Sequence, residues 1–188
     1  MNSWLLYLGA ILSISLSCFG SVPQVFGKSY YDSYREGKCG LNVLNFFERL
    51  ESEGEDIAGL SLVYLENKGP SVFGMVNAEK ARSQVNEKLF TEEKNWYQHQ
   101  FAIDKNGMVY DFDYSNSPSP KPFKDYVEDM FLNENECTNP KPAEFCAGRK
   151  EKLNDYHLNL IEAAEVIEGN GPSYWSGTLQ QALNKFRN

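Results

Sequence analysis

The chain has 188 residues, with 18 Lys and Arg against 26 Asp and Glu, which gives a formal net charge of −8. This length suits a single domain that buries a hydrophobic core. An acidic chain without a Lys/Arg cluster is repelled by phosphate backbones, so nucleic acid is excluded as the expected partner. We expect a monomer.

The N-terminal segment has the composition of an export signal. Residues 4–19 are apolar or small and carry no charge. The run is short for a membrane span and resembles the core of a signal peptide. Small residues allow cleavage after Gly20 or after Gly27, so residues 1–27 are assigned to the leader and residues 28–188 to one domain. We therefore expect a secreted or periplasmic protein without a stable membrane span; lipid attachment at Cys18 is an alternative.

Removal of the leader leaves three of the four cysteines. Cys137 and Cys146 lie in one Pro-containing loop, and close pairs form disulfides in an oxidising compartment. Cys39 is then the odd cysteine, either a buried inert thiol or a reactive one.

Cys39 stands at the predicted start of a helix. Residues 27–38 are polar and aromatic and are interpreted as an extended arm. Leu41, Leu44, Phe47 and Leu50 then follow helical spacing. The free N–H groups and the dipole at a helix start stabilise a thiolate, so this is a suitable position for a cysteine nucleophile.

Two strands and a surface helix are predicted next. Leu60–Glu66 and Ser71–Val76 are each typical of a strand, and the turn signal at Asn67–Pro70 joins them into a hairpin. Ala78–Phe90 has the weak amphipathic pattern of a surface helix.

The segment from Trp96 to Asp113 predicts a second β-hairpin. Tyr97, His99, Phe101 and Ile103 share one face because strand side chains alternate. The segment Lys105-Asn106-Gly107 suits a three-residue loop closed by a glycine with positive φ.

The register of this hairpin decides which carboxylate lies near His99. The loop pairs Asp104 with Met108, so His99 faces Asp113 and lies diagonal to Asp111. Directly opposite Cβ atoms are about 5 Å apart and diagonal ones about 7–8 Å, so either aspartate is within reach of the imidazole.

The remaining chain predicts a loop at 115–122 and then helices. Pro122 starts a helix in a favoured position, and its apolar stripe consists of Phe123, Tyr126, Val127, Met130 and Phe131. Another helical stripe consists of Leu153, Tyr156, His157, Leu160, Ile161, Ala164 and Ile167. His157 is interpreted as a core residue of that helix. Gly169–Gly177 is predicted to be a loop, and Leu179–Phe186 a closing helix.

The order Cys39, His99, then Asp111 or Asp113 matches the needs of a cysteine nucleophile. Such a nucleophile requires a base within hydrogen-bond reach and a third group that orients the base. A cysteine on a helix that packs on a sheet carrying the histidine and carboxylate is the papain-like and transglutaminase-like plan. Two histidines make a His-rich zinc site improbable, and no metal or cofactor motif is present. We expect no cofactor and no metal; surface polarity at a strand end is the alternative.

The surrounding motifs resemble those of the protein N-terminal glutamine amidohydrolase family. That family has Cys-x-x-Asn-Val, Trp three residues before its histidine, Tyr-Asp-Leu-Asp and Tyr-Val-Glu-Asp. This chain has Cys39-Gly-Leu-Asn42-Val43, Trp96 before His99, Tyr110-Asp111-Phe112-Asp113, and Tyr126-Val127-Glu128-Asp129. The resemblance covers roughly residues 34–132.

The resemblance implies an α+β, papain-like or transglutaminase-like fold with the nucleophile helix packed on an antiparallel sheet, followed by C-terminal helices. It also implies Cys39 as nucleophile, His99 as base and Asp111 as orienting acid, with Trp96 and Asp113 at the substrate. Glu92 and Glu93 are further choices for binding a free α-amino group. The expected activity is deamidation of protein or peptide glutamine, N-terminal glutamine included.

The chain departs from the family in two respects, and two alternative functions remain. The family acts inside cells, whereas this chain carries an export signal, and its part after residue 133 does not match. A cysteine peptidase or transglutaminase on the same scaffold is one alternative, and a non-catalytic secreted binding protein is another.

Overall fold

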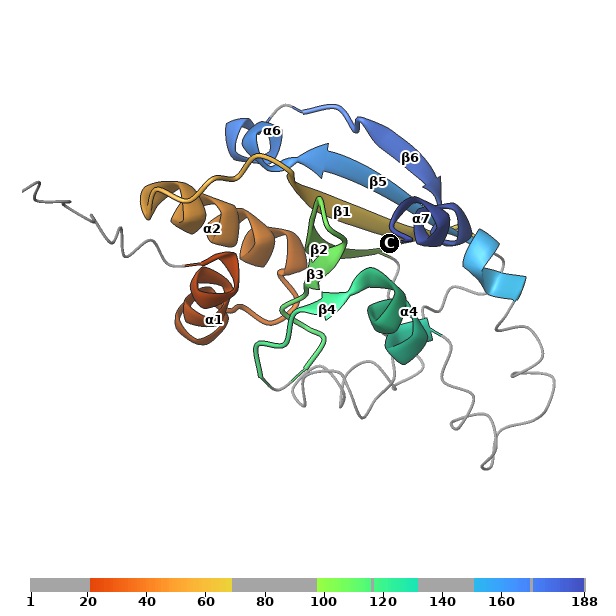
Figure 1. Cartoon of the computed structure of the whole chain (residues 1–188), viewed down its shortest axis with the longest axis horizontal. Helices are drawn as coiled ribbons and strands as arrows, with labels where there is room; N and C mark the ends of the chain where they lie inside the picture. Colours follow the sequence, from red (N-terminus) through yellow and green to blue (C-terminus); the bar gives the residue numbers. More distant parts are fainter. Residues whose placement is uncertain (1–20, 69–97, 116, 132–150, 170, 188) are drawn as a thin grey trace, which may run out of the picture.

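The computed structural model describes residues 21–68, 98–115, 117–131, 151–169 and 171–187. These residues form a mixed α+β structure around an antiparallel sheet (Figure 1). The strand order is β4-β3-β2-β1-β5-β6. The strands are β1 Leu60–Asn67, β2 Gln98–Asp104, β3 Met108–Tyr110, β4 Lys121–Pro122, β5 Tyr156–Glu162 and β6 Trp175–Thr178.

Helices pack on both faces of this sheet. They are α1 Val22–Asp32, α2 Cys39–Ser52, α4 Phe123–Phe131, α6 Ala163–Glu168 and α7 Leu179–Lys185, with a short 3-10 helix, η2, at Glu151–Asn154. Side chains of α1, α2 and α6 share one core cluster, and side chains of α4 and α7 share the other. Consecutive strand residues point to opposite faces, so β1, β2, β3 and β5 each supply side chains to both clusters.

The core beneath α1 and α2 is rich in aromatic rings. Phe26 is fully buried, and its ring centroid lies 4.9 Å from that of Phe112 and 5.6 Å from that of Phe46, both in edge-on geometry. Such pairs add favourable ring contacts to the burial of large apolar surfaces. This packing fixes α1 and α2 against the sheet.

The hairpin that follows residue 97 has the expected register. Ala102 pairs with Tyr110 and Ile103 with Val109, as a loop pairing Asp104 with Met108 requires. Gly107 has φ of +79°, and the Asp104 side chain accepts the backbone N–H groups of Asn106 and Met108. The turn thus follows from local residues. The strand at Leu60–Glu66 and the helices starting at Cys39, near Pro122 and at Leu179 are also present.

The predicted extended arm is wrong, because much of it belongs to helix α1. Val22, Val25, Phe26, Ser29 and Tyr30 follow helical spacing, but this pattern straddles the boundary drawn at Gly27. Val25 and Phe26 are 0% exposed. Cleavage after Gly27 would cut α1 and remove both core residues, whereas cleavage after Gly20 leaves α1 whole.

The single helix predicted from Leu153 to Ile167 is also wrong. The chain forms η2, then strand β5, then α6. Along β5 buried Tyr156, Leu158 and Leu160 alternate with more exposed residues, a period of two. Several of the same apolar positions also fit a helical period, which explains the error. His157 therefore lies half-buried on a strand, and part of the loop predicted at Gly169–Gly177 forms β6.

Several predictions fall outside the described residues. They are the strand at Ser71–Val76, the helix at Ala78–Phe90, Glu92, Glu93, Trp96, and the disulfide between Cys137 and Cys146. Among the helices that the structure describes, none has the length and apolar character required to cross a membrane.

Candidate active site

His99 and Asp111 form the centre of the site. Nε2 of His99 donates a hydrogen bond to Oδ2 of Asp111 over 2.8 Å, and both side chains are almost fully buried. His99 lies where β2 continues past the end of β3, because β3 stops at Tyr110. The chain leaving β3 therefore passes beside the imidazole.

A local turn explains why Asp111, rather than Asp113, bonds to His99. Strand pairing ends before residue 111, so the regular register does not extend to Asp113. Oδ1 of Asp111 accepts the backbone N–H of Asp113 over 2.9 Å. This side-chain-to-backbone bond is the Asx turn that aspartate favours, and it bends the chain away from the strand. The diagonal carboxylate is thereby brought to the imidazole.

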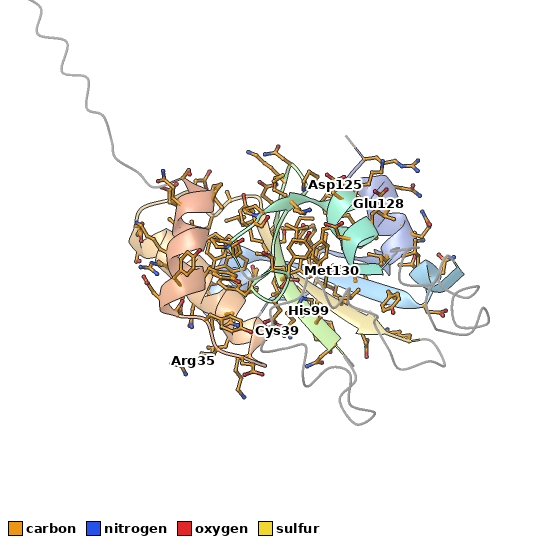
Figure 2. All side chains as sticks on the ribbon, turned by 90° about the horizontal axis from the view of Figure 1, so that it is seen from below. Arg35, Cys39, His99, Asp125, Glu128 and Met130 are labelled. Carbon is orange, nitrogen blue, oxygen red and sulfur yellow. The ribbon has the colours of Figure 1, made fainter. Side chains whose placement is uncertain are left out.

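Cys39 completes a three-residue constellation. It is the first residue of α2, is half-buried, and is a free thiol. Its side chain hydrogen-bonds to the side chain of His99. Figure 2 shows Cys39, at the start of α2, beside His99 on β2. Because Nε2 of His99 is hydrogen-bonded to Asp111, Nδ1 is the imidazole nitrogen available to hydrogen-bond with Cys39.

The loop before Cys39 is fixed at two points. The Asn42 carboxamide accepts the N–H of Arg35 and donates to the carbonyl oxygen of Arg35, both over 2.8 Å. Tyr34 donates its hydroxyl to Oδ1 of Asp113 over 2.6 Å. Asn42 is 1% exposed and Asp113 is 5% exposed. Two buried polar residues thus set the path of the chain into the helix that carries the thiol.

Tyr126 adds a donor from the opposite helical layer. Its hydroxyl donates to Oδ2 of Asp111 over 2.7 Å, the same oxygen that His99 binds. Burial and the Asp111 carboxylate raise the pKa of Tyr126 well above its usual value. The phenol therefore stays protonated and remains a donor.

The environment of His99 favours the imidazolium form. Burial lowers the pKa of His99, but the charge and hydrogen bond of Asp111 and the nearby Cys39 outweigh this and raise it to about 10. An imidazolium held beside a thiol stabilises the thiolate. The arrangement is suited to a cysteine nucleophile with a charged partner.

Gln100 approaches the start of α2 from the same strand as His99. A Cβ atom placed on Gly40 would lie 2.3 Å from Oε1 of Gln100, so the carboxamide rests against this glycine. The first N–H groups of a helix have no partner within the helix. The start of α2 therefore offers backbone N–H groups, with a side-chain carboxamide beside them.

A metal ion is an alternative occupant. His99, Asp111 and Asp113 each offer a ligand atom, and these atoms lie within 4.8 Å of one another. Imidazole and carboxylate ligands suit several divalent metals. However, His99 and Asp111 bond to each other, and Asp111 and Asp113 also accept tyrosine hydroxyls. Metal binding would have to replace these hydrogen bonds.

The structure thus brings together Cys39, His99 and Asp111, and it places Asp113 in a buried bond with Tyr34. Trp96 lies outside the described part of the chain. Sequence reasoning did not assign Tyr34, Asn42, Gln100 or Tyr126 to the site. For Tyr126 a signal existed: it was included in an apolar stripe, and a buried tyrosine hydroxyl usually needs a partner.

Comparison with known proteins adds no family assignment. No protein-family model matches this chain, and no curated protein sequence matches it. The chemistry of the site must therefore be argued from its own residues.

Proposed function

We propose that the protein is a cysteine-dependent amidohydrolase that deamidates glutamine side chains of proteins or peptides, N-terminal glutamine included. The observation that carries this proposal is the continuous chain of contacts from Cys39 through His99 to Asp111. A nucleophile, a base and an orienting acid in this order are what acyl transfer by a cysteine requires.

The proposal extends to the type of fold. Helix α2, which begins with the nucleophile, packs on an antiparallel sheet, and the histidine lies on strand β2 of that sheet. This arrangement supports a papain-like or transglutaminase-like fold. The choice of glutamine as substrate depends on the motif resemblance around these residues, not on the geometry.

The reaction uses the residues as follows. The proton of the Cys39–His99 pair resides on His99, as the imidazolium, and the thiolate of Cys39 attacks the δ-carbonyl carbon of glutamine. The C–N bond then breaks as the imidazolium protonates the leaving nitrogen, which departs as ammonia. Water, deprotonated by His99, attacks the thioester and releases glutamate with the free thiol. Asp111 holds the imidazole in the required tautomer throughout.

The oxyanion formed at each step needs hydrogen-bond donors. Backbone N–H groups at the start of α2 are suitable, because they carry the positive end of the helix dipole. The carboxamide of Gln100 lies with its oxygen nearest to Gly40, and its NH2 group is the further donor that we propose. A Cβ atom at position 40 would displace this carboxamide, because it would occupy the space that the carboxamide fills.

Export is part of the proposal. The apolar run at residues 4–19 is suited to a signal peptide, and cleavage after Gly20 preserves α1 with its buried Val25 and Phe26. The mature chain would then begin at Ser21.

The test is ammonia release from two peptides, one with N-terminal and one with internal glutamine. Wild type and Cys39→Ala are compared on each, with added amine and intact-mass analysis of the products. Ammonia release that disappears in Cys39→Ala, without peptide cleavage, supports deamidation. Peptide cleavage supports a peptidase, and incorporation of the amine supports a transglutaminase.

The same protein preparations test the two alternatives to catalysis by Cys39, a non-catalytic protein and a metal site. If wild type and Cys39→Ala are equally inactive on both peptides with Cys39 reduced, the deamidase proposal is wrong. Metal analysis of wild type and Asp113→Asn then tests whether His99, Asp111 and Asp113 bind a metal ion. That hypothesis requires bound metal in the wild type and its loss in the variant.

A further inference from the structure

Tyr126 contacts the acid of the site from the helical layer opposite to that of Cys39. It lies on α4, whereas Cys39 lies on α2 in the opposite helical layer. Its hydroxyl and Nε2 of His99 donate to one and the same oxygen, Oδ2 of Asp111, over 2.7 Å and 2.8 Å. We propose that Tyr126 is a positioning residue that acts through Asp111 to orient His99 and to limit how strongly Asp111 holds the imidazolium. This inference depends on the proposed function for its catalytic consequence.

The hydroxyl completes the hydrogen bonding of a buried carboxylate. Asp111 is 5% exposed, so water supplies little solvation, and its charge depends on neighbouring donors. Oδ1 accepts the N–H of Asp113, and Oδ2 accepts both His99 and Tyr126. With a partner on each oxygen, the carboxylate has a fixed plane, and this plane orients the imidazole.

The ring of Tyr126 is itself held in place. Its centroid lies 5.0 Å from that of Phe101 and 5.5 Å from that of Tyr114, and the side chain is 1% exposed. Phenylalanine would fill the same space. The hydroxyl is therefore the part of this residue that acts on the site.

The electrostatic effect has a definite sign. A hydroxyl that donates to Oδ2 takes up part of the negative charge on that oxygen. Without it, Asp111 attracts the imidazolium more strongly, and His99 keeps its proton to higher pH. A weaker acid protonates the leaving nitrogen more slowly, so the chemical step slows while substrate binding does not change.

Tyr114 provides a matched control. It is also buried, packs against the ring of Tyr126, and donates its hydroxyl to a carboxylate. That carboxylate is Asp129, which also binds Lys121 and is not part of the site. Tyr114→Phe therefore removes a comparable hydroxyl without touching Asp111.

The experiment compares wild type, Tyr126→Phe and Tyr114→Phe. The chain has two histidines, so NMR of the imidazole carbons follows His99 across pH 10 once His157→Gln identifies the other signal. In Tyr126→Phe we expect the His99 midpoint at higher pH and kcat lower by about 10-fold, the size of one hydrogen bond to a charged group, with KM unchanged. Tyr114→Phe is expected to change neither.

Each outcome decides the inference. A His99 midpoint that is the same in all three proteins overturns it. A shifted midpoint in Tyr126→Phe, in a wild type that releases no ammonia, supports the positioning role and contradicts only the proposed function. If Tyr126→Phe does not fold, the hydroxyl proton of Tyr126 is followed in the wild type. It must shift with the same midpoint as His99, and a pH-independent hydroxyl signal would overturn the proposal.

Discussion

The two histidines of the chain occupy the two strands that flank β1, but their environments are very different. On β1, Leu65 pairs with His99 and the next residue, Glu66, pairs with His157, so the two imidazoles point to opposite faces. His99 is 2% exposed and bonded to Asp111, whereas His157 is half-buried. The same residue type, on two strands of one sheet, becomes the buried partner of a carboxylate only at His99, where β3 ends and the chain that follows it carries Asp111 to the imidazole.

The largest expected effect separates these histidines by activity. Replacing His99 with Gln removes the base of the proposed reaction, and we expect ammonia release to fall about 10⁴-fold or more. His157→Gln changes a half-buried residue outside the site, and we expect kcat and KM close to wild type. Both variants are assayed on the glutamine peptide that the wild type prefers. Equal losses in the two variants would contradict the assignment of the site.

The second prediction concerns Gln100, the residue that follows His99 and lies against the opposite helical layer. Gln100→Leu keeps the size of the side chain but removes the carboxamide near Gly40, whose NH2 group is the proposed donor. Loss of one oxyanion donor typically lowers kcat by about 10²–10³-fold. Gln98→Leu is the matched control, since Gln98 is exposed on the same strand and binds Tyr64. The kcat values of both variants measure the difference, and similar values would remove Gln100 from the mechanism.

Some features of this site can be predicted from the local sequence, and others cannot. The hairpin register follows from local chemistry: Asp104 and Gly107 define the turn, and the turn aligns Ile103 with Val109. The choice of Asp111 over Asp113 does not follow from the register. It depends on where β3 stops and on the Asx turn at Asp111, and the register alone slightly favoured the other aspartate.

Other features were hidden because they depend on distant parts of the chain. Tyr126 reaches Asp111 because α4 packs on the face of the sheet that carries Phe101, and no spacing in the sequence encodes that contact. The segment around His157 fits both helical and strand periods, and pairing with β1 and β6 decides for the strand. Contacts between distant parts of the chain thus determine both the Tyr126–Asp111 bond and the strand at His157.

The third prediction concerns the loop that precedes Cys39 and positions its thiol beside His99. Asn42→Ala removes both bonds to the backbone of Arg35. We expect the free energy of unfolding to fall by about 1–3 kcal/mol for each backbone group left unpaired. Displacement of the thiol by about 1 Å can lower activity by up to about 100-fold. Asn45→Ala, on the same helix and half-buried, is the control. Urea unfolding and kcat are measured together, and an unchanged kcat would show that the loop does not position Cys39.

The last prediction concerns stability rather than activity, and it is a difference in the pH dependence of unfolding. The pKa of His99 is raised from 6.5 to about 10 in the folded protein, so the folded state binds the proton more tightly than the unfolded state. The resulting stabilisation is fully present below pH 6.5 and is lost as the pH rises through about 10. One proton changes the free energy of unfolding by at most about 1.4 kcal/mol per pH unit.

Denaturant unfolding of wild type, His99→Gln and His157→Gln across this pH range measures that loss. We expect wild type and His157→Gln to lose stability with the same slope, because both retain His99 beside Asp111. His99→Gln is expected to have a shallower slope, since the group that binds the extra proton is gone. If His157→Gln, and not His99→Gln, makes the free energy of unfolding less dependent on pH, the histidine with the raised pKa is the one on β5. The proposal that a charged His99 stabilises the Cys39 thiolate would then be wrong.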